Sequence, residues 1–283
     1  MKAAAIVTDT NSGITAAEAE RLGIHLIPMP FFINGVQHLE GQTCRTEDFF
    51  RALAEDAEVS TSQPAPGEII RLWERLLQEH EAVLHFPMSS GLSGSCQTAR
   101  ALAAEYPGRV FVVDNKRISV TLAQSILDAQ KLLAEGRPPR EVHAVLEREG
   151  LNASIYIAVN TLAHLKKSGR VTAAGAAMAA VLNLKPVLQI QGEKLDAFRK
   201  ARGMAQAKQI MLDAMRNDLD RRFQGQETAL FAVYSGDPED GVRWQEEVLA
   251  AFPGREVRLA ALPISICCHV GAGTLAIACS KKL

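Results

Sequence analysis

Residues 82–95 read AVLHFPMSSGLSGS and decide the fold class of this chain. The run 82–86 is short and apolar, which is typical of a buried strand. A segment of small hydroxyl and glycine residues, 88–95, follows it and leads into a helical pattern. A strand, a loop and a helix in this order form the repeating unit of a parallel sheet covered by helices.

The same unit recurs on both sides of this stretch. An apolar run at 3–8 predicts a first strand, and Thr15 with Glu18 predicts a capping box at the start of the next helix. Residues 110–113 form another short apolar run before a helical pattern. We therefore predict an N-terminal three-layer α/β/α domain with a mainly parallel sheet over residues 1–152.

The second half has a different pattern. Two segments, 186–190 and 194–199, flank Gln191-Gly192-Glu193, which indicates a hairpin and hence antiparallel pairing. Further strands are predicted at 154–159, 228–234, 256–262 and 274–279. We predict a second, two-layer α/β domain with a mixed sheet over residues 153–283, and a ligand between the two domains, because clefts between domains are common binding sites.

One segment resembles a membrane span. Residues 259–280 contain no Asp, Glu, Lys or Arg and are long enough to cross a bilayer. Pro263, Gly271 and Gly273 interrupt the segment. Two buried strands on either side of a glycine-rich loop explain these residues better than a membrane helix does.

The composition excludes several classes of protein. The net charge is −1 and aromatic residues make up 5% of the chain, which disfavours a nucleic-acid-binding surface. The five cysteines are odd in number and have no CxxC spacing, so neither a disulfide framework nor a structural zinc site is expected. A reducing, cytoplasmic location fits this cysteine usage, and we expect neither a metal nor a cofactor.

Two loops rich in hydroxyl groups are the candidate ligand-binding elements. Ser89-Ser90-Gly91-Leu92-Ser93-Gly94 follows a predicted strand, and Ser60-Thr61-Ser62-Gln63-Pro64 is a second cluster. Backbone N–H groups and the start of a helix would favour an anion at the first loop. From local pattern alone, helix capping is the more common role for such loops, since Ser is common at N-caps and Pro64 could open a helix.

Familiar catalytic motifs are absent. The chain has no GxxxxGK[ST], HExxH or GxSxG motif, and its seven histidines show no metal-binding spacing. An assembly of Ser93, His269 and Asp114 is compatible with the spacing, so a stand-alone serine-type hydrolase of acyl esters is the alternative function.

The stretch 173–182 consists almost entirely of small apolar residues. A helix of this kind either lets another helix pack closely or leaves room for an apolar ligand. In the second case Ala176, Met178 and Leu182 would line a tunnel, with Met178 as an adaptable wall.

Six segments, in order, resemble motifs of the DegV family, which includes the fatty-acid-binding (FakB-like) subunits of bacterial fatty acid kinase. The segments are Ile6-Val7-Thr8-Asp9-Thr10, Ser60-Thr61-Ser62-Gln63-Pro64, Ser89-Ser90-Gly91-Leu92-Ser93-Gly94, Leu165-Lys166-Lys167-Ser168-Gly169-Arg170, Leu182-Asn183-Leu184-Lys185-Pro186 and His269-Val270-Gly271-Ala272-Gly273. The chain departs from the family pattern at Thr10, Asn115 and Ala272.

This resemblance implies a function without catalysis of its own. Proteins of this family bind a long-chain fatty acid between two α/β domains, and the acid's carboxylate would contact Thr61, Ser62, Ser93, Gly94 and His269. A dihydroxyacetone-kinase-like subunit would then use ATP to phosphorylate the bound acid. Transient contact with a membrane surface would deliver the lipid.

Two arginines are further candidates from the resemblance. Arg170 and Arg202 would lie near the carboxyl end of the ligand, where they would contact the kinase partner or the transferred phosphoryl group. The local sequence, taken without the resemblance, allows another interpretation: Arg170 follows Lys166-Lys167 and could belong to a solvated basic patch.

Overall fold

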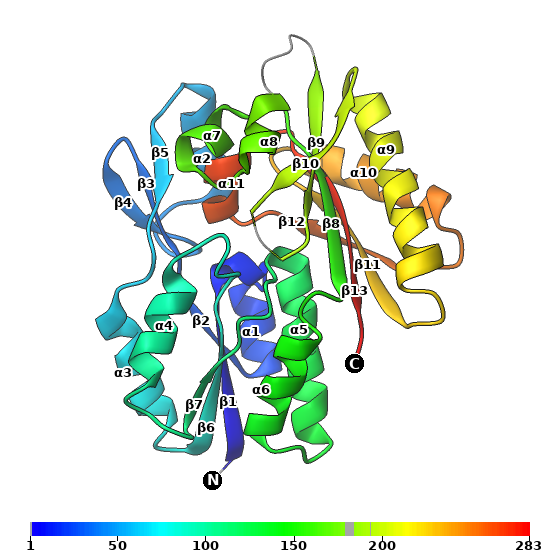
Figure 1. Cartoon of the computed structure of the whole chain (residues 1–283). Coiled ribbons are helices and arrows are strands. Elements are labelled where there is room, and N and C mark those ends of the chain that lie inside the picture. Colours follow the sequence, from blue (N-terminus) through cyan, green and yellow to red (C-terminus); the bar gives the residue numbers. More distant parts are fainter. Residues whose placement is uncertain (1, 179–183, 193) are drawn as a thin grey trace.

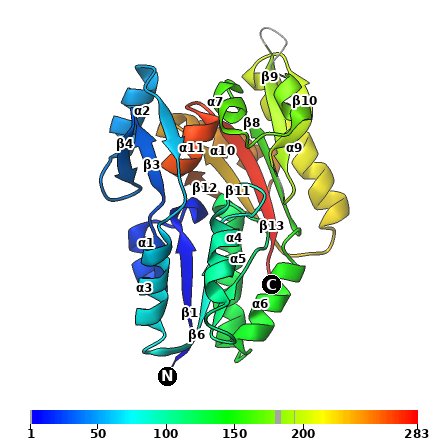
Figure 2. The ribbon, with the colours of Figure 1, turned by 60° about the vertical axis from the view of Figure 1, so that its left-hand side comes forward.

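The computed structural model of the chain describes residues 2–178, 184–192 and 194–283. Its strands form three sheets, of which one is parallel, one is antiparallel and one is mixed. The parallel sheet forms one half of the molecule and the mixed sheet the other half, as Figures 1 and 2 show. The predicted α/β class, with a parallel and a mixed sheet, is confirmed.

The parallel sheet has the strand order β2-β1-β6-β7. Its strands are β1 (Lys2–Asp9), β2 (Ile24–Ile27), β6 (His80–Phe86) and β7 (Val110–Val112). One face is covered by α1 (Ala16–Leu22), α5 (Ser119–Ala134) and α6 (Pro139–Arg148), and the other by α3 (Pro66–Leu76) and α4 (Ser95–Ala103). The capping box of Thr15 and Glu18 begins α1 as predicted.

A small antiparallel sheet follows β2 along the chain. It contains β3 (Pro30–Ile33), β4 (Val36–Leu39) and β5 (Val59–Thr61), with α2 (Thr46–Ala54) between the last two. Asn34 and Gly35 form the turn between β3 and β4, and both have positive φ angles, 48° and 80°. This pair of angles is typical of the tight hairpin turn that favours Asn-Gly.

The mixed sheet has the strand order β10-β9-β8-β13-β11-β12. Its strands are β8 (Ala153–Ala158), β9 (Lys185–Ile190), β10 (Asp196–Ala201), β11 (Thr228–Tyr234), β12 (Val257–Ala261) and β13 (Leu275–Lys281). The helices α9 (Met204–Asn217) and α10 (Pro238–Ala251) pack on one face. The predicted hairpin is the antiparallel pair β9–β10. A domain boundary at residue 152 stays a prediction.

Three short helices lie near the other face of this sheet. They are α7 (Ala163–Ser168), α8 (Ala173–Ala177) and α11 (Ile264–Val270). The sequence predicts two strands around a glycine-rich loop in 259–280, and this prediction misses α11, which lies between β12 and β13. Among the described residues, no helix is both long enough and apolar enough to cross a bilayer.

Candidate functional site

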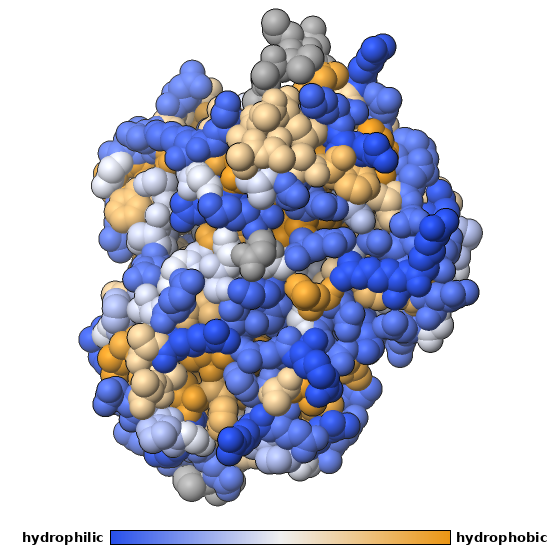
Figure 3. All heavy atoms as spheres, in the orientation of Figure 1, coloured by the Kyte–Doolittle hydropathy of each residue, from blue (hydrophilic) through white to orange (hydrophobic). Residues whose placement is uncertain are grey.

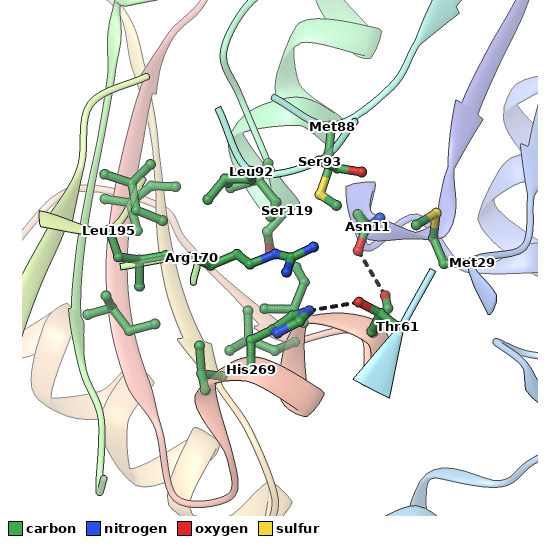
Figure 4. A pocket seen from close by; sticks show the side chains of 18 of the residues that line it. Asn11, Met29, Thr61, Met88, Leu92, Ser93, Ser119, Arg170, Leu195 and His269 are labelled. Carbon is green, nitrogen blue, oxygen red and sulfur yellow. Dashed lines mark hydrogen bonds between the residues drawn. The ribbon is translucent and has the colours of Figure 1, made fainter. Parts of the chain in front are cut away.

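A cavity of about 270 Å³ lies between the mixed sheet and the loops of the first half of the chain. This is nearly twice the roughly 150 Å³ of an engineered protein cavity that admits benzene. Most of its wall is apolar and comes from β8, β9, β11 and β13, through Ile155, Ile157, Ile190, Val233, Ala276 and Ala278. One end is polar, and Figure 4 shows its side chains converging from several distant segments.

Thr61 and His269 form the link between two of these segments. Thr61 ends β5, His269 lies on α11, and the Thr61 Oγ1 to His269 Nε2 distance is 2.9 Å. Burial, and then the charge of Arg170, lower the pKa of His269 to about 4, so its ring is neutral at neutral pH. The interpretation of residues 60–64 as a helix cap is wrong, because α3 begins at Pro66, after Ala65, which makes no side-chain cap bond.

Ser93 belongs to the loop between β6 and α4, and it lines the cavity together with Thr61 and Ser62. Its Oγ accepts from the N–H of Ser95 at 3.1 Å, which leaves the hydroxyl proton available for a ligand. Gly94 is the N-cap residue of α4 and also lines the cavity. The loop therefore stabilises a helix start and presents a donor at the same time.

Two carboxylates at the carboxyl edge of the parallel sheet hold this loop in place. Asp9 accepts from the N–H of Met88 at 3.1 Å, and Asp114 accepts from the N–H of Ser90 at 3.2 Å. Burial raises the pKa of Asp9 to about 6. These aspartates position the hydroxyl loop from behind, since neither lines the cavity.

A buried polar network joins the first half of the chain to α11. Ser265 Oγ lies 2.8 Å from Asn11 Oδ1 and 2.7 Å from Glu40 Oε2, and Thr10 Oγ1 donates to the same Glu40 oxygen at 2.7 Å. Burial raises the pKa of Glu40. Asn11 and Ser265 both line the cavity, so this network fixes α11 and with it His269 against the loop edge.

The two candidate arginines lie in different surroundings. Arg170 lines the cavity, and its guanidinium lies between Ser119 and His269 in the view of Figure 4. It donates to the carbonyl of Ser168, and no carboxylate in the described part of the chain pairs with it. Arg202 is exposed after β10 and is not among the residues that line the cavity.

The small apolar helix α8 contributes no residue to the wall of this cavity. Met178 is buried in the cluster that surrounds the cavity, and Ala176 is half-buried against it, yet neither borders the cavity. Leu182 lies outside the described residues. Ala173, Ala174 and Ala177 are exposed, and Figure 3 shows an apolar area over α8 with hydrophilic side chains around it.

The hydrolase triad is not assembled in this structure. His269 Nε2 bonds to Thr61 rather than Ser93, and Asp114 pairs with Lys116 at 3.2 Å. His269 Nδ1 has no hydrogen-bond partner among the described residues. Within the same residues, no group of three or more His, Cys, Asp or Glu side chains could hold a metal ion.

Several lining residues were missed in the sequence. Asn11, Met29, Ser119 and Ser265 all border the cavity. Asn11 follows the carboxyl end of β1, and this position on a parallel strand is a usable signal for a ligand site. The other three residues have no local pattern that separates them from ordinary core or helix positions.

Comparison with known proteins gives a consistent result. A family model described as "Uncharacterised protein, DegV family" matches residues 3–282. A DegV domain-containing protein of Deinococcus radiodurans is 30% identical over 236 residues, which cover 83% of this chain and 84% of that protein.

Two solved structures are similar over the whole chain. One is described as "Fatty Acid Binding of a DegV family Protein from Thermus thermophilus", with 32% identity, a TM-score of 0.89, and coverage of 99% of this chain and 100% of that one. The other, "Crystal Structure of DegV, a fatty acid binding protein from Bacillus subtilis", has 25% identity, a TM-score of 0.88 and full coverage of both chains.

Proposed function

This chain belongs to the DegV family, and from that premise we propose that it binds one long-chain fatty acid. The acyl chain occupies the apolar cavity, and the carboxylate meets Thr61, Ser93 and the neighbouring Ser62 and Gly94 at its polar end. The observation that carries the proposal is a cavity walled by apolar strands and closed by hydroxyl groups beside a neutral histidine. The solved relatives described as fatty-acid-binding support it.

The binding energy follows from burial of the acyl chain. Each buried CH₂ contributes about 0.8 kcal/mol, so a long chain supplies most of the affinity. The carboxylate must then be hydrogen-bonded, and hydroxyl groups satisfy it without a full ion pair. Because the wall is apolar and the hydrogen-bond donors lie at one end, the cavity favours a lipid with one acidic group.

The histidine sets the direction of the Thr61 hydroxyl. If Nε2 of neutral His269 carries the proton, it donates to Thr61 Oγ1 and frees the Thr61 proton for the ligand. The opposite tautomer would take that proton and turn a lone pair toward the carboxylate. The bound state therefore selects the Nε2–H tautomer, and His269 acts as a positioning residue.

We further propose that the bound acid is presented to a separate, dihydroxyacetone-kinase-like subunit. There a carboxylate oxygen attacks the γ-phosphorus of ATP, the bond to the β-phosphate oxygen breaks, and ADP leaves with the electron pair. Arg170 borders the cavity at its polar end, where its charge would assist this transfer. Arg202 is exposed and would contact the partner. The exposed alanines of α8 would make transient membrane contact during lipid exchange.

The first experiment is mass spectrometry of lipid extracted from the denatured, purified protein. We expect a fatty acid in about equimolar amount; no lipid, together with no uptake of added oleate, would contradict the binding function.

Kinase presentation is tested separately, by following ATP with and without the cognate kinase subunit. Acyl phosphate should form only with the subunit, and Arg170→Ala should lower turnover more than it lowers oleate binding. Acyl phosphate formed by this chain alone would contradict the carrier function.

A further inference from the structure

Ser119 has an unusual position for a serine. It is the first residue of the 16-residue helix α5, it lines the cavity, and it is 5% exposed. Its Oγ is buried and has no hydrogen-bond partner among the described residues. A buried hydroxyl without a partner is costly, so a group that the protein binds is expected to satisfy it.

The backbone of Ser119 strengthens this reasoning. Its φ angle is +53°, in the left-handed region that residues with a Cβ atom rarely occupy. Glycine would adopt this angle without strain, yet the position carries a hydroxyl. Backbone strain that the surrounding structure maintains is typical of ligand-contacting positions.

The N-terminus of α5 adds positive potential at this side of the polar end, and Arg170 lies close enough to act on both sides, since its charge also lowers the pKa of His269. The N-terminus of a long helix carries a partial positive charge, and Ile118 and Val120 beside Ser119 also border the cavity. Arg170 contributes a full positive charge, and Figure 4 places its guanidinium between Ser119 and His269. Thr61, Ser93 and neutral His269 offer only uncharged groups to a ligand.

We propose that Ser119, the N-terminus of α5 and Arg170 form a second subsite, which holds the phosphoryl group of an acyl phosphate. This inference rests on the proposed function. A phosphoryl group adds more charge than a carboxylate and three further acceptor oxygens, which suits a cationic subsite with an unused hydroxyl donor. The hydroxyl groups of Thr61 and Ser93 hold the acyl oxygens, and the second subsite receives the group added to them.

The test compares two ligands with equal chains. One is palmitate, and the other is the hydrolysis-stable phosphonate in which CH₂ replaces the oxygen that joins the acyl carbon to phosphorus. Calorimetry gives the ratio of the two dissociation constants for the wild type, Ser119→Ala and Ser119→Gly. The two variants lack the hydroxyl and differ in backbone strain, so agreement between them isolates the hydroxyl.

Ser95→Ala is the matched control. Ser95 is also the first residue of its helix, is 4% exposed and has an Oγ without a partner among the described residues, but it does not line the cavity. We expect Ser119→Ala and Ser119→Gly to weaken phosphonate binding by about tenfold or more, as for a lost hydrogen bond to a charged group, and to change palmitate binding far less. Ser95→Ala should leave the ratio as in the wild type.

An unchanged ratio in both Ser119 variants, or equal losses for both ligands, would overturn the second subsite. Inorganic phosphate in large excess is the remaining arm. It should weaken phosphonate binding to the wild type more than to Ser119→Ala, because it competes for the same subsite; equal weakening of both proteins would overturn the subsite. A wild type that binds no palmitate would contradict the proposed function itself.

Discussion

The two faces of the mixed sheet both carry apolar residues, but one face packs against helices and the other borders the cavity. On one face Leu275, Ile277 and Cys279 of β13 pack in a cluster with α9 and α10. On the other face Ala276 and Ala278 of the same strand border the cavity. One face is filled by helices and the other is hollow.

On β13, side-chain size differs between the two faces. Along β13 the larger residues point to the helices and the two alanines point to the cavity. Both sets are apolar, so hydrophobicity does not distinguish a packed core from a ligand cavity. On β11 the pattern is reversed, because Val233 borders the cavity and Ala232 faces the helices, so the space depends on where the helices lie as well as on the alanines of β13.

The largest expected effect is on stability at the filled face. Met211, on α9, is fully buried there, so Met211→Ala should lower the free energy of unfolding by about 2–5 kcal/mol. Ile157→Ala on the hollow face should cost about 1–2 kcal/mol, because part of that side chain already borders empty space. Urea unfolding of the lipid-free proteins measures both; equal losses would show that the two faces are packed alike.

Larger side chains should affect ligand binding on the hollow face and stability on the filled face. Ala278→Leu places new atoms in space that the ligand needs, so palmitate binding should weaken by about 3 kcal/mol, that is more than a hundredfold, with little loss of stability. Ala232→Leu is the matched change on the filled face, where overpacking should cost about 1–3 kcal/mol of stability and leave binding intact. Calorimetric titration and unfolding of both variants decide between these outcomes.

The polar end of the hollow face should contribute less to affinity than the apolar wall does. Thr61→Ala and Ser93→Ala should each weaken palmitate binding by about 1.5–3 kcal/mol, since each would remove a hydrogen bond that the proposed binding mode gives to the carboxylate. Thr61→Ser keeps the hydroxyl and should bind nearly as the wild type does. If both alanine variants bound palmitate like the parent in a fluorescence competition assay, the carboxylate would lie elsewhere.

The last comparison concerns the pH dependence of stability from His269, which borders the hollow face. Its pKa is lowered to about 4 from 6.5, so between these values the unfolded chain binds more protons. Stability should therefore fall by up to about 1.4 kcal/mol per pH unit as the pH falls from 6.5 to 4, and His269→Gln should remove this part of the slope.

His143 provides the opposite sign as a control. Its bond to Glu147 raises its pKa, so its contribution is present at low pH and is lost as the pH rises through that raised value. Unfolding measured from pH 4 to pH 8 on His143→Gln and His269→Gln should give slope changes of opposite direction. Slope changes of the same direction would contradict the assignment of a neutral, buried His269.

Strand and helix positions could be predicted because they depend on local pattern. The capping box at Thr15 and the strand before Ser89 are set by residues close in sequence. The helix α11 could not be separated from its surroundings, because a short apolar helix and a short apolar strand have similar composition.

The candidate site was predictable only in part, for a related reason. The hydroxyl groups of Thr61 and Ser93 stood out as clusters in the sequence, and both border the cavity. Ser119 did not stand out, because an orphaned hydroxyl and a positive φ angle exist only once the chain is folded. Arg170 and Arg202 looked equivalent in sequence, and only tertiary structure separates a cavity position from an exposed one.

The hydrogen bond between Thr61 and His269 joins residues that are 208 positions apart in the chain. During synthesis at about 5–20 residues per second, roughly 10–40 s pass between the appearance of the first residue and that of the second. The parallel sheet is complete long before then, because its last strand ends at Val112. If the chain binds a fatty acid as proposed, a nascent chain with a complete parallel sheet would still lack half of the polar end of the site, and it could retain the lipid only once α11 has been made.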